Sequence, residues 1–543
     1  MTDVFDFVIV GSGPGGCVLA DRLTADGRTT ACVLEAGIAD RHPMIRVPVG
    51  FVRTLYNPIF TWPFVAEPSN AVANRAIKLP QGRVVGGSSS VNGLAYSRGQ
   101  RRDFDDWAAA GSTGWSYREV LPYFMRSERR IGPGDDRFRG RTGPLPITNP
   151  DWPSPLCEAF LEGAAELGVP RNPDYNGARQ EGAGYFQRTI DRGRRVSTAD
   201  AFLHPAIRRG GVDLRIGAEA RTITFEEGRA TGIRYVQGGA ELGVTARCEV
   251  LLCGGTLNTP RLLQLSGIGP GEVLATADVP VRVDLPGVGR NLRDHYTVRI
   301  AARARGLATL NERSRGWRLW VEIARWLAGR PSILALSPSL VHVFWTSQPG
   351  LGRGDIQVLF TPASYEEGKT YSLEREPGMS CGARQQRPFS SGFVQIRSAD
   401  PAVTPSIQPN YLGDARDQEM IVRALRFARD LLPTRALAPY FAGETLPGPS
   451  VQSDEDWLDF ARRRGGTAYH LVGTCRMGPA GDRDAVLDPT LKVRGVEKLR
   501  VVDASVMPQV PSANTMAATL MVAEKAADLI LGRPPLPAAD LST

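Results

Sequence analysis

The stretch VFDFVIVGSGPGGCVLADRLTADGRTTACVLE, residues 4–35, decides the fold. Residues 4–10 alternate and are rich in β-branched and aromatic side chains, which predicts a strand. A glycine-rich turn follows, residues 17–23 have the pattern of a helix, and residues 30–34 predict a second strand. This order of elements is typical of the βαβ unit that begins a parallel sheet and binds a dinucleotide.

The turn carries the pattern G-x-G-x-x-G at Gly11, Gly13 and Gly16. We expect Gly11 to allow the tight turn, Gly13 to let the backbone approach a pyrophosphate, and Gly16 to allow close helix–strand packing. The helix N-terminus then faces the phosphates. Glu35 follows the second strand, 24 residues after Gly11, and is placed to accept a hydrogen bond from a ribose hydroxyl.

Two further glycine-rich segments contribute to the predicted fold. Residues 81–93, QGRVVGGSSSVNG, fit neither a regular helix nor a strand, so we expect an extended chain against a flat ligand, with a flexible linker as the alternative. A strand at 246–253 runs into a helix at 261–266, which predicts a second strand–glycine–helix crossover at another edge of the sheet. The other predicted elements are strands at 212–221, 230–236, 356–360, 392–397 and 499–502, and helices at 103–110, 317–328, 414–432 and 516–531.

The length of 543 residues exceeds one hydrophobic core, because cores stop growing at about 250–300 residues. Hydrophobic residues make up 42% and charged residues 22% of the chain, as in globular proteins. The pattern changes character from residue 301 and returns to alternating strand and helix from residue 499. We therefore expect an α/β protein with a Rossmann-like domain that is discontinuous in sequence and a second domain of mixed β-sheet and helices.

Composition excludes several classes of function. The net charge is +8, but only five of the 65 basic residues are lysines and the arginines are scattered, so we expect no nucleic-acid partner. The most apolar stretch, residues 332–345, is shorter than the about 20 residues that a membrane span needs, so we expect no stable membrane insertion. Seven cysteines without metal-ligand spacing, and no cleavable segment before the first strand, favour a cytoplasmic protein.

Four separated motifs occur together in the chain. They are the N-terminal fingerprint ending in LEAG (34–37), GGSSSVNG (86–93), GTLNTPRLLQLSGIG (255–269), and a C-terminal set of YH (469–470), GTCRMG (473–478), VDASVMP (502–508) and SANT (512–515). On these motifs the chain resembles the glucose–methanol–choline (GMC) flavoprotein oxidoreductases along nearly its whole length. In detail it resembles their bacterial choline dehydrogenase and sorbose/alcohol dehydrogenase branch.

The resemblance implies a bound FAD and the oxidation of an alcohol to an aldehyde or ketone, with oxygen or a quinone-type compound as electron acceptor. It also implies an FAD-binding domain in three parts, residues 1–150, 195–300 and 463–543, and a substrate-binding domain in two parts, residues 151–194 and 301–462. The implied cofactor contacts are Gly11, Gly13, Gly16 and Glu35 for the ADP half, Ala220 for adenine, Val84, Gly87, Asn92 and Gly93 for the isoalloxazine and ribityl chain, and Asp503 and Ala504 beside the pyrophosphate or ribityl.

The chain departs from the family pattern at four places. Leu471 follows the motif histidine where Pro is common, Met516 stands in place of an Asn, and Ser391 stands in place of an Arg. These departures weaken a substrate assignment more than the reaction class. Val91 occupies the position where some members carry the histidine that bonds covalently to the flavin, so we expect non-covalent FAD.

Alcohol oxidation by a flavin needs a base for the hydroxyl proton and a second polar group to orient the oxygen. Histidine suits the base because its pKa lies near working pH. His470 matches the catalytic histidine of the family, and Asn514 matches its partner, which is His or Asn. The remaining histidines include His295, which we expect to serve packing.

The substrate pocket has weaker signals. Tyr469 precedes the base and is a candidate for the pocket wall, with a simple core aromatic as the alternative. His342 and Phe344 are further candidates, although the sequence favours an interior strand histidine for His342 over a residue that faces the cavity. Trp317, Trp320 and Trp326 have helical spacing, which more often indicates ordinary packing than a pocket cap or a membrane contact.

Three functions remain to be distinguished. The leading one is an FAD-dependent alcohol dehydrogenase or oxidase. The second keeps the flavin without net oxidation, as in hydroxynitrile lyase-like or photodecarboxylase-like family members, and the pair His470 and Asn514 argues against it. The third is an NAD(P)-dependent oxidoreductase or a binding module without redox activity. Sugar alcohols and choline-like, aromatic and polyether alcohols all remain open as substrates.

Overall fold

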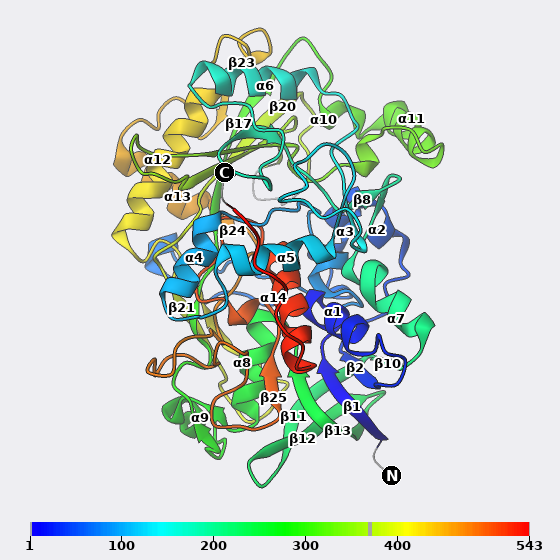
Figure 1. The fold of residues 1–543 in the computed structure, drawn as a ribbon. Coiled ribbons are helices and arrows are strands. Elements are labelled where there is room, and N and C mark those ends of the chain that lie inside the picture. Colours follow the sequence, from blue (N-terminus) through cyan, green and yellow to red (C-terminus); the bar gives the residue numbers. More distant parts are fainter. Residues whose placement is uncertain (1–2, 367–371, 542–543) are drawn as a thin grey trace.

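The computed structural model describes residues 3–366 and 372–541, and in these residues an α/β fold is built on two seven-stranded sheets (Figure 1). The first sheet has the order β10-β2-β1-β13-β12-β11, with β25 also pairing with β13. Strands β10, β2, β1, β13 and β25 are parallel, as the βαβ start predicts. The bounds are β1 Asp3–Val10, β2 Ala31–Glu35, β10 Val212–Ile216, β11 Ala218–Glu226, β12 Arg229–Gln237, β13 Ala240–Leu252 and β25 Leu499–Val501.

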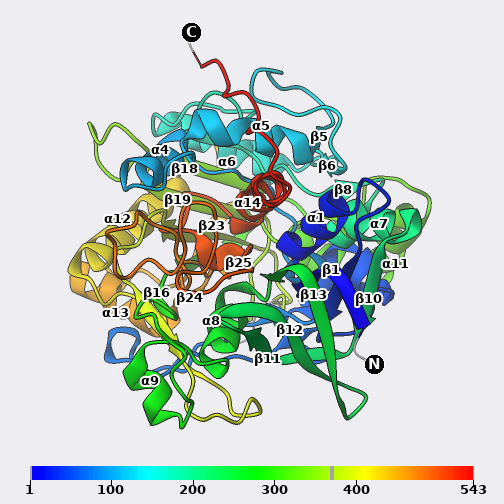
Figure 2. The same cartoon turned by 60° about the horizontal axis from the view of Figure 1, so that its bottom comes forward.

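The two ends of the chain meet beside this sheet. Helix α1 (Pro14–Leu23) packs against α14 (Thr515–Ile530), and both Figure 1 and Figure 2 show the two helices side by side. Arg22 of α1 forms an ion pair with Glu524 of α14, with 2.8 Å between Nη2 and Oε1. Arg126 of α5 (Tyr117–Ser127) pairs with the same carboxylate, with 2.6 Å between Nε and Oε2. The C-terminal helix therefore packs against two helices from the N-terminal part of the chain.

The second sheet has the order β23-β17-β20-β19-β18-β7, with β24 also pairing with β17. Helices α6 (Pro155–Glu166) and α12 (Ala415–Leu431) pack on this sheet around a shared apolar cluster. Its opposite face points toward the first sheet and forms part of the cavity described below. The bounds are β7 Gly182–Tyr185, β17 Tyr296–Ala304, β18 Val341–Trp345, β19 Ile356–Thr361, β20 Gly378–Gln385, β23 Phe441–Leu446 and β24 Gly466–Thr467.

Most predicted elements are present within a few residues, and four predictions were wrong in detail. The strand predicted at 212–221 is divided at Gly217 into β10 and β11. Strand β13 lies inside the sheet, between β1 and β12, instead of at an edge. Part of the segment predicted as extended, Gly87–Ser90, forms a 3₁₀ helix. Strand β13 begins at Ala240, six residues before the predicted start at residue 246.

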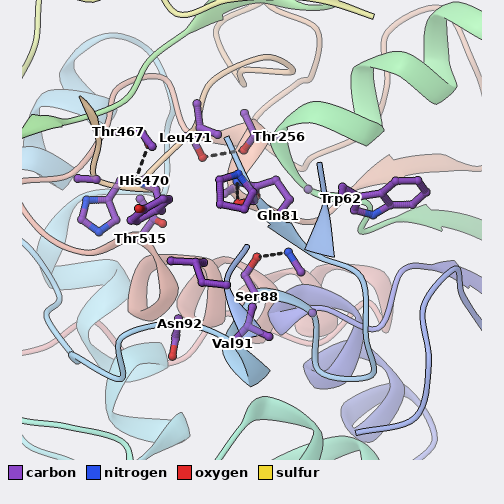
Figure 3. Close-up of a pocket in the computed structure, with 18 of the residues that line it drawn as sticks. Trp62, Gln81, Ser88, Val91, Asn92, Thr256, Thr467, His470, Leu471 and Thr515 are labelled. Carbon is purple, nitrogen blue, oxygen red and sulfur yellow. Dashed lines mark hydrogen bonds between the residues drawn. The ribbon is translucent and has the colours of Figure 1, made fainter. Parts of the chain in front are cut away.

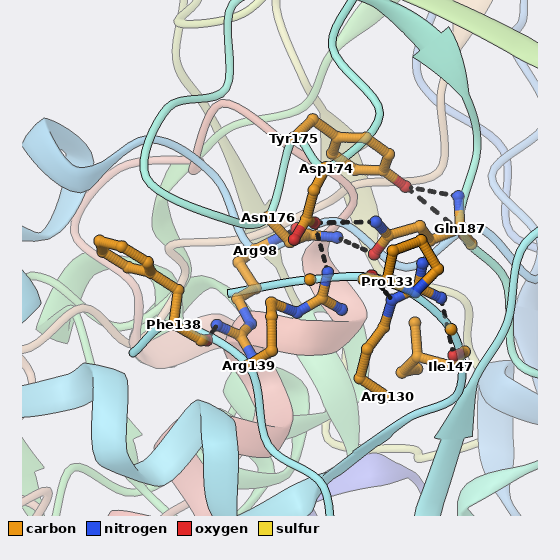
Figure 4. A network of polar contacts seen from close by, with 12 residues as sticks. Arg98, Arg130, Pro133, Phe138, Arg139, Ile147, Asp174, Tyr175, Asn176 and Gln187 are labelled. Carbon is orange, nitrogen blue, oxygen red and sulfur yellow. Dashed lines mark hydrogen bonds and ion pairs between the residues drawn. The ribbon is translucent and has the colours of Figure 1, made fainter. Parts of the chain in front are cut away.

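The expected domain borders remain a prediction, although β17 starts at Tyr296, inside the range 195–300 that we expected to bind FAD. A buried polar network joins two of the expected segments (Figure 4). Arg139 donates from Nε to Glu128 Oε1 at 2.8 Å and also pairs with Asp174, and Gln187 Nε2 donates to Asp174 Oδ1 at 2.9 Å. Residues 1–150 and 151–194 are thus locked together through desolvated ion pairs.

Helix α11 (Gly316–Leu327) corrects the expectation of ordinary packing for its tryptophans. Trp317 and Trp320 are 71% and 72% exposed, and Trp326 alone of the three turns inward. In the described residues, no helix is long and apolar enough to cross a membrane.

Candidate active site

A cavity of about 990 Å³ lies between the two sheets, and Figure 3 shows part of its lining. At one end its wall consists of the β1–α1 turn, the end of β2 and the start of α8 (Gly255–Leu265). At the other end its wall consists of β17, β19 and β20, together with the loop 465–471 and the start of α14. We call these the nucleotide end and the substrate end.

Backbone packed against backbone forms the nucleotide end. Gly11 has a φ of 99°, and a Cβ there would lie 2.5 Å from the carbonyl oxygen of Cys253. A Cβ on Gly16 would lie 1.9 Å from the oxygen of Gly11, so helix α1 touches the turn only because Gly16 has no side chain. A Cβ on Gly87 would lie 2.7 Å from Cα of Gly13, which brings the second glycine motif directly onto the first.

Glu35 is buried at the end of β2 and lines this end of the cavity. Its Oε2 accepts hydrogen bonds from Ser12 N at 3.0 Å and Ser12 Oγ at 2.6 Å, and its Oε1 accepts from Gly37 N at 2.8 Å. Burial raises the pKa of the carboxyl, and these donors oppose the shift. A carboxylate has about four acceptor positions, so Glu35 keeps capacity for ribose hydroxyls while it holds the glycine turn in place.

Asp503 binds protein groups with both carboxylate oxygens. Oδ2 accepts from Gly255 N at 2.8 Å and Thr259 Oγ1 at 2.6 Å, and Oδ1 accepts from Ser505 N at 2.8 Å. Burial raises its pKa. Asp503 therefore fixes the N-terminus of α8 to the C-terminal segment, at the wall of the cavity.

The structure brings most of the sequence-predicted residues to one cavity. The residues that line it are Gly11, Gly13, Glu35, Gly87, Asn92, Gly93, Ala220, Tyr469, His470, Asp503, Ala504 and Asn514. Gly16 lies behind the turn in the packing position expected for it. Val84 does not line the cavity, because it is buried in an apolar cluster with Ile45, Phe60 and Val91.

His342 and Phe344, which we named as candidates for the pocket, do not line this cavity. They lie on β18, one strand further from the cavity than β19, and pack with Tyr175 and Phe186. The His342 ring centroid is 4.2 Å from that of Tyr175, neither ring nitrogen has a hydrogen-bond partner, and burial lowers its pKa to about 3. Phe186 itself reaches the cavity and separates His342 from it.

A chain of hydrogen bonds runs from the backbone to the cavity through two histidines. His295 Nε2 lies 2.8 Å from the carbonyl oxygen of Gln386, and His295 Nδ1 lies 2.9 Å from His470 Nδ1. His470 Nε2 lies 2.9 Å from Asn514 Nδ2. We expected His295 to serve packing only, so sequence reasoning missed its hydrogen bond to the candidate base.

The acceptor at the end of the chain fixes the tautomers. Because a carbonyl oxygen only accepts, His295 Nε2 carries the proton, and its Nδ1 has a lone pair when the ring is neutral. His470 Nδ1 then donates to that lone pair, and His470 Nε2 is left unprotonated toward the cavity. Burial, with the nearby Arg384 cation, lowers the pKa of His295 to about 3. Burial, Arg384 and His295 lower the pKa of His470 well below 6.5, so both rings are neutral at pH 7.

The backbone of His470 is held by a buried carboxylate. Asp294 Oδ1 accepts from His470 N at 2.7 Å, and its Oδ2 accepts from Thr467 and Tyr411. Burial raises the pKa of Asp294 to about 6. Tyr469 has a φ of 66°, which turns the chain so that Tyr469 and His470 both reach the cavity. The motif Asp294-His295 thus supports both the backbone and the ring of His470.

The departures from the family pattern lie at different places. Leu471 and Met516 line the cavity, and Asn92 Nδ2 lies 3.4 Å from the Met516 sulfur. Ser391 does not line the cavity. Val91 lines it with an apolar side chain that has no nucleophilic atom.

The cavity fits FAD on structural grounds. The glycine turn, Glu35 and the N-terminus of α8 form a cradle for a nucleotide diphosphate, and the same cavity continues without a break to His470. The residues that would hold the ADP half and the residues that would meet a reacting alcohol therefore face one elongated space.

Comparison with family models decides the class of protein. The GMC oxidoreductase N-terminal model matches residues 5–297, and the GMC oxidoreductase C-terminal model matches residues 388–523. The chain belongs to the GMC oxidoreductases. Members of this family bind FAD, so the chain is an FAD-dependent oxidoreductase with the GMC fold.

Relatives within the GMC family act on alcohols. The chain is 38% identical over 538 residues to the oxygen-dependent choline dehydrogenase of Photobacterium profundum, covering 99% of this chain and 94% of the relative. Pyridoxine 4-oxidase from Mesorbium loti superposes with a TM-score of 0.88 at 32% identity, covering 96% of this chain and 98% of the other. A fungal aryl-alcohol oxidase superposes with a TM-score of 0.84 at 25% identity, covering 98% and 99%. This GMC protein is an FAD-dependent alcohol oxidoreductase, and the non-oxidative alternative is not favoured.

Proposed function

We propose that His470 removes the hydroxyl proton of the alcohol and that Asn514 orients the oxygen. The observation that carries this proposal is the hydrogen-bond chain from the Gln386 carbonyl through His295 to His470, from which we infer an unprotonated His470 Nε2 at the cavity, 2.9 Å from Asn514 Nδ2. Because the two nitrogens are hydrogen-bonded to each other, the substrate hydroxyl takes the place of this contact, donating to His470 Nε2 and accepting from Asn514 Nδ2. Bound FAD supplies the acceptor for the carbon-bound hydrogen.

The surroundings of His470 suit a base that must release its proton again. Burial and Arg384 disfavour the protonated ring, so the proton taken from the alcohol is held only weakly. Asn514 does not titrate, so it orients the oxygen without competing for the proton. Its Oδ1 is buried without a hydrogen-bond partner, which leaves the amide one unused acceptor at the site.

We further propose non-covalent FAD, oxygen or a quinone-type compound as electron acceptor, and a cytoplasmic location. Val91 supports non-covalent binding, since it offers no atom for a bond to the flavin. The printed names of the relatives, an oxygen-dependent dehydrogenase and an aryl-alcohol oxidase, support oxygen.

The test is an anaerobic panel of alcohols mixed with the purified yellow protein while flavin absorbance is followed. Bleaching by at least one alcohol class is expected, and repetition in air with peroxide detection, and with a quinone, identifies the acceptor. Acid precipitation should leave the flavin in the supernatant. Flavin that stays with the pellet would contradict non-covalent binding, and a flavin that no alcohol bleaches would contradict alcohol oxidation.

A further inference from the structure

The substrate end of the cavity is cationic. Arg299 on β17 and Arg384 on β20 project from the face of the second sheet that lines the cavity, because Thr297 pairs with Arg384 and residues two apart in a strand share a face. Arg384 is 3% exposed, and in the described part of the chain neither arginine has a carboxylate partner within ion-pair distance. Arg299 stacks on Tyr365, with its guanidinium carbon 4.1 Å from the ring centroid.

Arg384 has a donor without an acceptor. Its Nε donates to Gln357 Oε1 at 2.7 Å, and its Nη1 lies 3.5 Å from His470 Nδ1. That nitrogen carries the proton donated to His295, so it has no lone pair for the arginine. The Nη1 group therefore remains available to a ligand in the cavity.

Two further polar groups at this place are unsatisfied. Thr297 Oγ1 and Gln357 Nε2 are buried without hydrogen-bond partners, and both residues lie opposite Arg384 on the neighbouring strands. Buried polar groups are normally paired, and Thr297 lines the cavity whereas Gln357 does not, so the Thr297 hydroxyl is the one of the two that indicates a polar ligand here.

Among the described residues, no acidic residue pairs with Arg299 or Arg384 at ion-pair distance, although Glu366 lines this end of the cavity and the charge of Asp294 acts on Arg384. Glu35 and Asp503 belong to the nucleotide end, where their oxygens are engaged as described above. Glu219 pairs with Arg83 and Arg221, at 3.4 and 3.2 Å.

We propose that the substrate is an alcohol carrying an anionic group, a carboxylate in its simplest form, bound by Arg384 and Arg299. This inference rests on the proposed alcohol oxidation at His470. A guanidinium matches a carboxylate through two parallel hydrogen bonds, whereas a quaternary ammonium such as choline meets the two cations Arg299 and Arg384. The expected preference thus differs from the substrate in the name of the choline dehydrogenase relatives.

The experiment uses three alcohols of one shape and three charges: 4-(hydroxymethyl)benzoate, benzyl alcohol and the 4-trimethylammonium analogue. A second set of 6-hydroxyhexanoate, 1-heptanol and choline repeats the comparison without the ring. Anaerobic flavin reduction by the holoenzyme should give a ratio of reduction rate constant to Kd at least tenfold higher for the anion than for the neutral alcohol, and lowest for the cation. A cation that reduces the flavin faster than the anion in both sets overturns the proposal.

Variants separate charge recognition from the chemistry. Arg299→Gln should raise KM for the anionic alcohol about tenfold, with kcat and the neutral alcohol little changed. Arg303→Gln is the matched control, since Arg303 lies on the same strand but pairs with Glu374 and Glu376 and does not line the cavity. An anion-to-neutral ratio that Arg299→Gln leaves unchanged overturns the assignment.

Binding without turnover distinguishes failure of this inference from failure of the proposed function. Benzoate should perturb the flavin spectrum of the holoenzyme with a Kd that rises in Arg299→Gln and Arg384→Gln, whether or not any alcohol is oxidised. If no alcohol bleaches the flavin but benzoate binds in this way, alcohol oxidation fails and the anion site stands. If alcohols are oxidised but benzoate binding is absent or indifferent to both arginines, the anion site fails.

Helix α11 supports a second, independent inference. Trp317, Trp320, Val321 and Leu327 are 71%, 72%, 44% and 73% exposed, and their spacing puts them on one face of the helix. The side toward the protein is held by polar contacts: Glu322 Oε2 accepts from Ile333 N at 3.1 Å, and Trp326 Nε1 donates to Gly193 O at 2.7 Å. The helix thus presents its apolar face outward, and Figure 1 shows it at the outer edge of the molecule.

The charges around this face indicate the partner. Arg325 borders the apolar face and Arg330 follows it, and Arg318, which also borders the face, pairs with Glu312 at 3.6 Å. The one acidic residue of the helix, Glu322, is 2% exposed and pairs with Arg313. Tryptophan beside arginine is the composition of helices that lie in the headgroup region of a membrane. We infer that α11 docks on an anionic phospholipid surface, without crossing it.

Vesicle sedimentation with the holoenzyme tests the docking. Vesicles of phosphatidylcholine with 30% phosphatidylglycerol should bind the protein, neutral phosphatidylcholine vesicles should bind it less, and added salt should weaken binding. The triple variant Trp317→Ser/Trp320→Ser/Leu327→Ser should lose binding at least tenfold, and the control Leu242→Ser/Val281→Ser, which alters exposed residues elsewhere, should not. The inference is overturned if the triple variant binds vesicles as well as the wild type does. It is also overturned if the wild type does not bind vesicles but self-associates in sedimentation velocity, and the triple variant alone abolishes that self-association.

Discussion

The two ends of the cavity are built in opposite ways. At the nucleotide end, contacts come from backbone: Cβ positions on Gly11 and Gly16 would lie 2.5 and 1.9 Å from carbonyl oxygens, and one contiguous motif supplies both residues. At the substrate end, side chains from separate segments converge, as His295, His470 and Asn514 do. The nucleotide end therefore tolerates almost no added volume, while the substrate end can change its chemistry by exchange of single side chains.

The largest expected effect separates the two ends outright. His470→Ala should retain FAD and fold, because the ring is not part of the glycine cradle, but anaerobic flavin reduction by a good alcohol should slow by about 10²–10⁴-fold. This corresponds to about 3–5 kcal/mol of barrier. Asn514→Ala should cost less and keep the pH dependence of the wild type, since Asn does not titrate. Rapid reduction in His470→Ala, with the pH dependence of the wild type, would remove His470 as the base.

The converse variant acts at the nucleotide end. Glu35→Ala should weaken FAD retention by about 10–150-fold, because it removes a charged acceptor worth about 1.5–3 kcal/mol, and should leave the reduction rate of retained flavin nearly unchanged. Equilibrium dilution with fluorescence of released flavin measures the affinity. Ser12→Ala is the control, since it removes one bond to Glu35 but leaves the carboxylate. Unchanged affinity in Glu35→Ala would remove Glu35 from the cofactor site.

A smaller effect tests the tautomer chain at the substrate end. His295→Leu should slow flavin reduction by about 2–10-fold, the worth of one hydrogen bond of about 0.5–1.5 kcal/mol, because His470 Nδ1 loses its acceptor. His295→Gln, whose side-chain oxygen can accept from His470, should recover part of the rate. A purely structural role for His295 predicts instead that both variants lose stability in parallel and show no difference in the rate.

The smallest expected effect is a shift in the pH at which the rate of flavin reduction falls. The pKa of His470 is held well below 6.5 by burial, by Arg384 and by His295, so the neutral base persists on acidification and flavin reduction should fall only below pH 6.5. Arg384→Gln removes a neighbouring cation, so the pKa of His470 should rise and the acid limb should move to higher pH. Arg303→Gln should leave the limb in place. If the pH dependence of flavin reduction in Arg384→Gln matches that of the wild type, Arg384 does not act on the base.

Sequence reasoning succeeded where the signal is local. The βαβ start, the glycines and Glu35 follow one another within residues 4–35, and their spacing alone predicts their structure. Strand β20, GMSCGARQ, was missed because it has few β-forming residues and is held as a strand by pairing with β17 and β19.

The substrate end shows why the rest was not predictable. His342 lies on a strand of the correct sheet, but only the strand order shows that it is one strand too far from the cavity. Arg299 and Arg384 become neighbours because β17 pairs with β20, about 80 residues further along the chain. No pattern in either strand predicts this pairing. His295 was found in its motif, yet its contact with His470 depends on a fold that joins positions 175 residues apart.

The contact of α1 with α14 sets an order of events during synthesis. The ion pair from Arg22 to Glu524 joins residues 502 positions apart, so the first helix waits for nearly the whole chain before its partner leaves the ribosome. At about 5–20 residues per second, that interval is roughly 25–100 s. During this time the apolar side of α1, including Val18 and Leu19, lacks the cover that α14 provides in the finished protein. The FAD site is thus completed only after α14 has left the ribosome, and nascent chains stalled before residue 515 should neither retain the cofactor nor escape binding by chaperones.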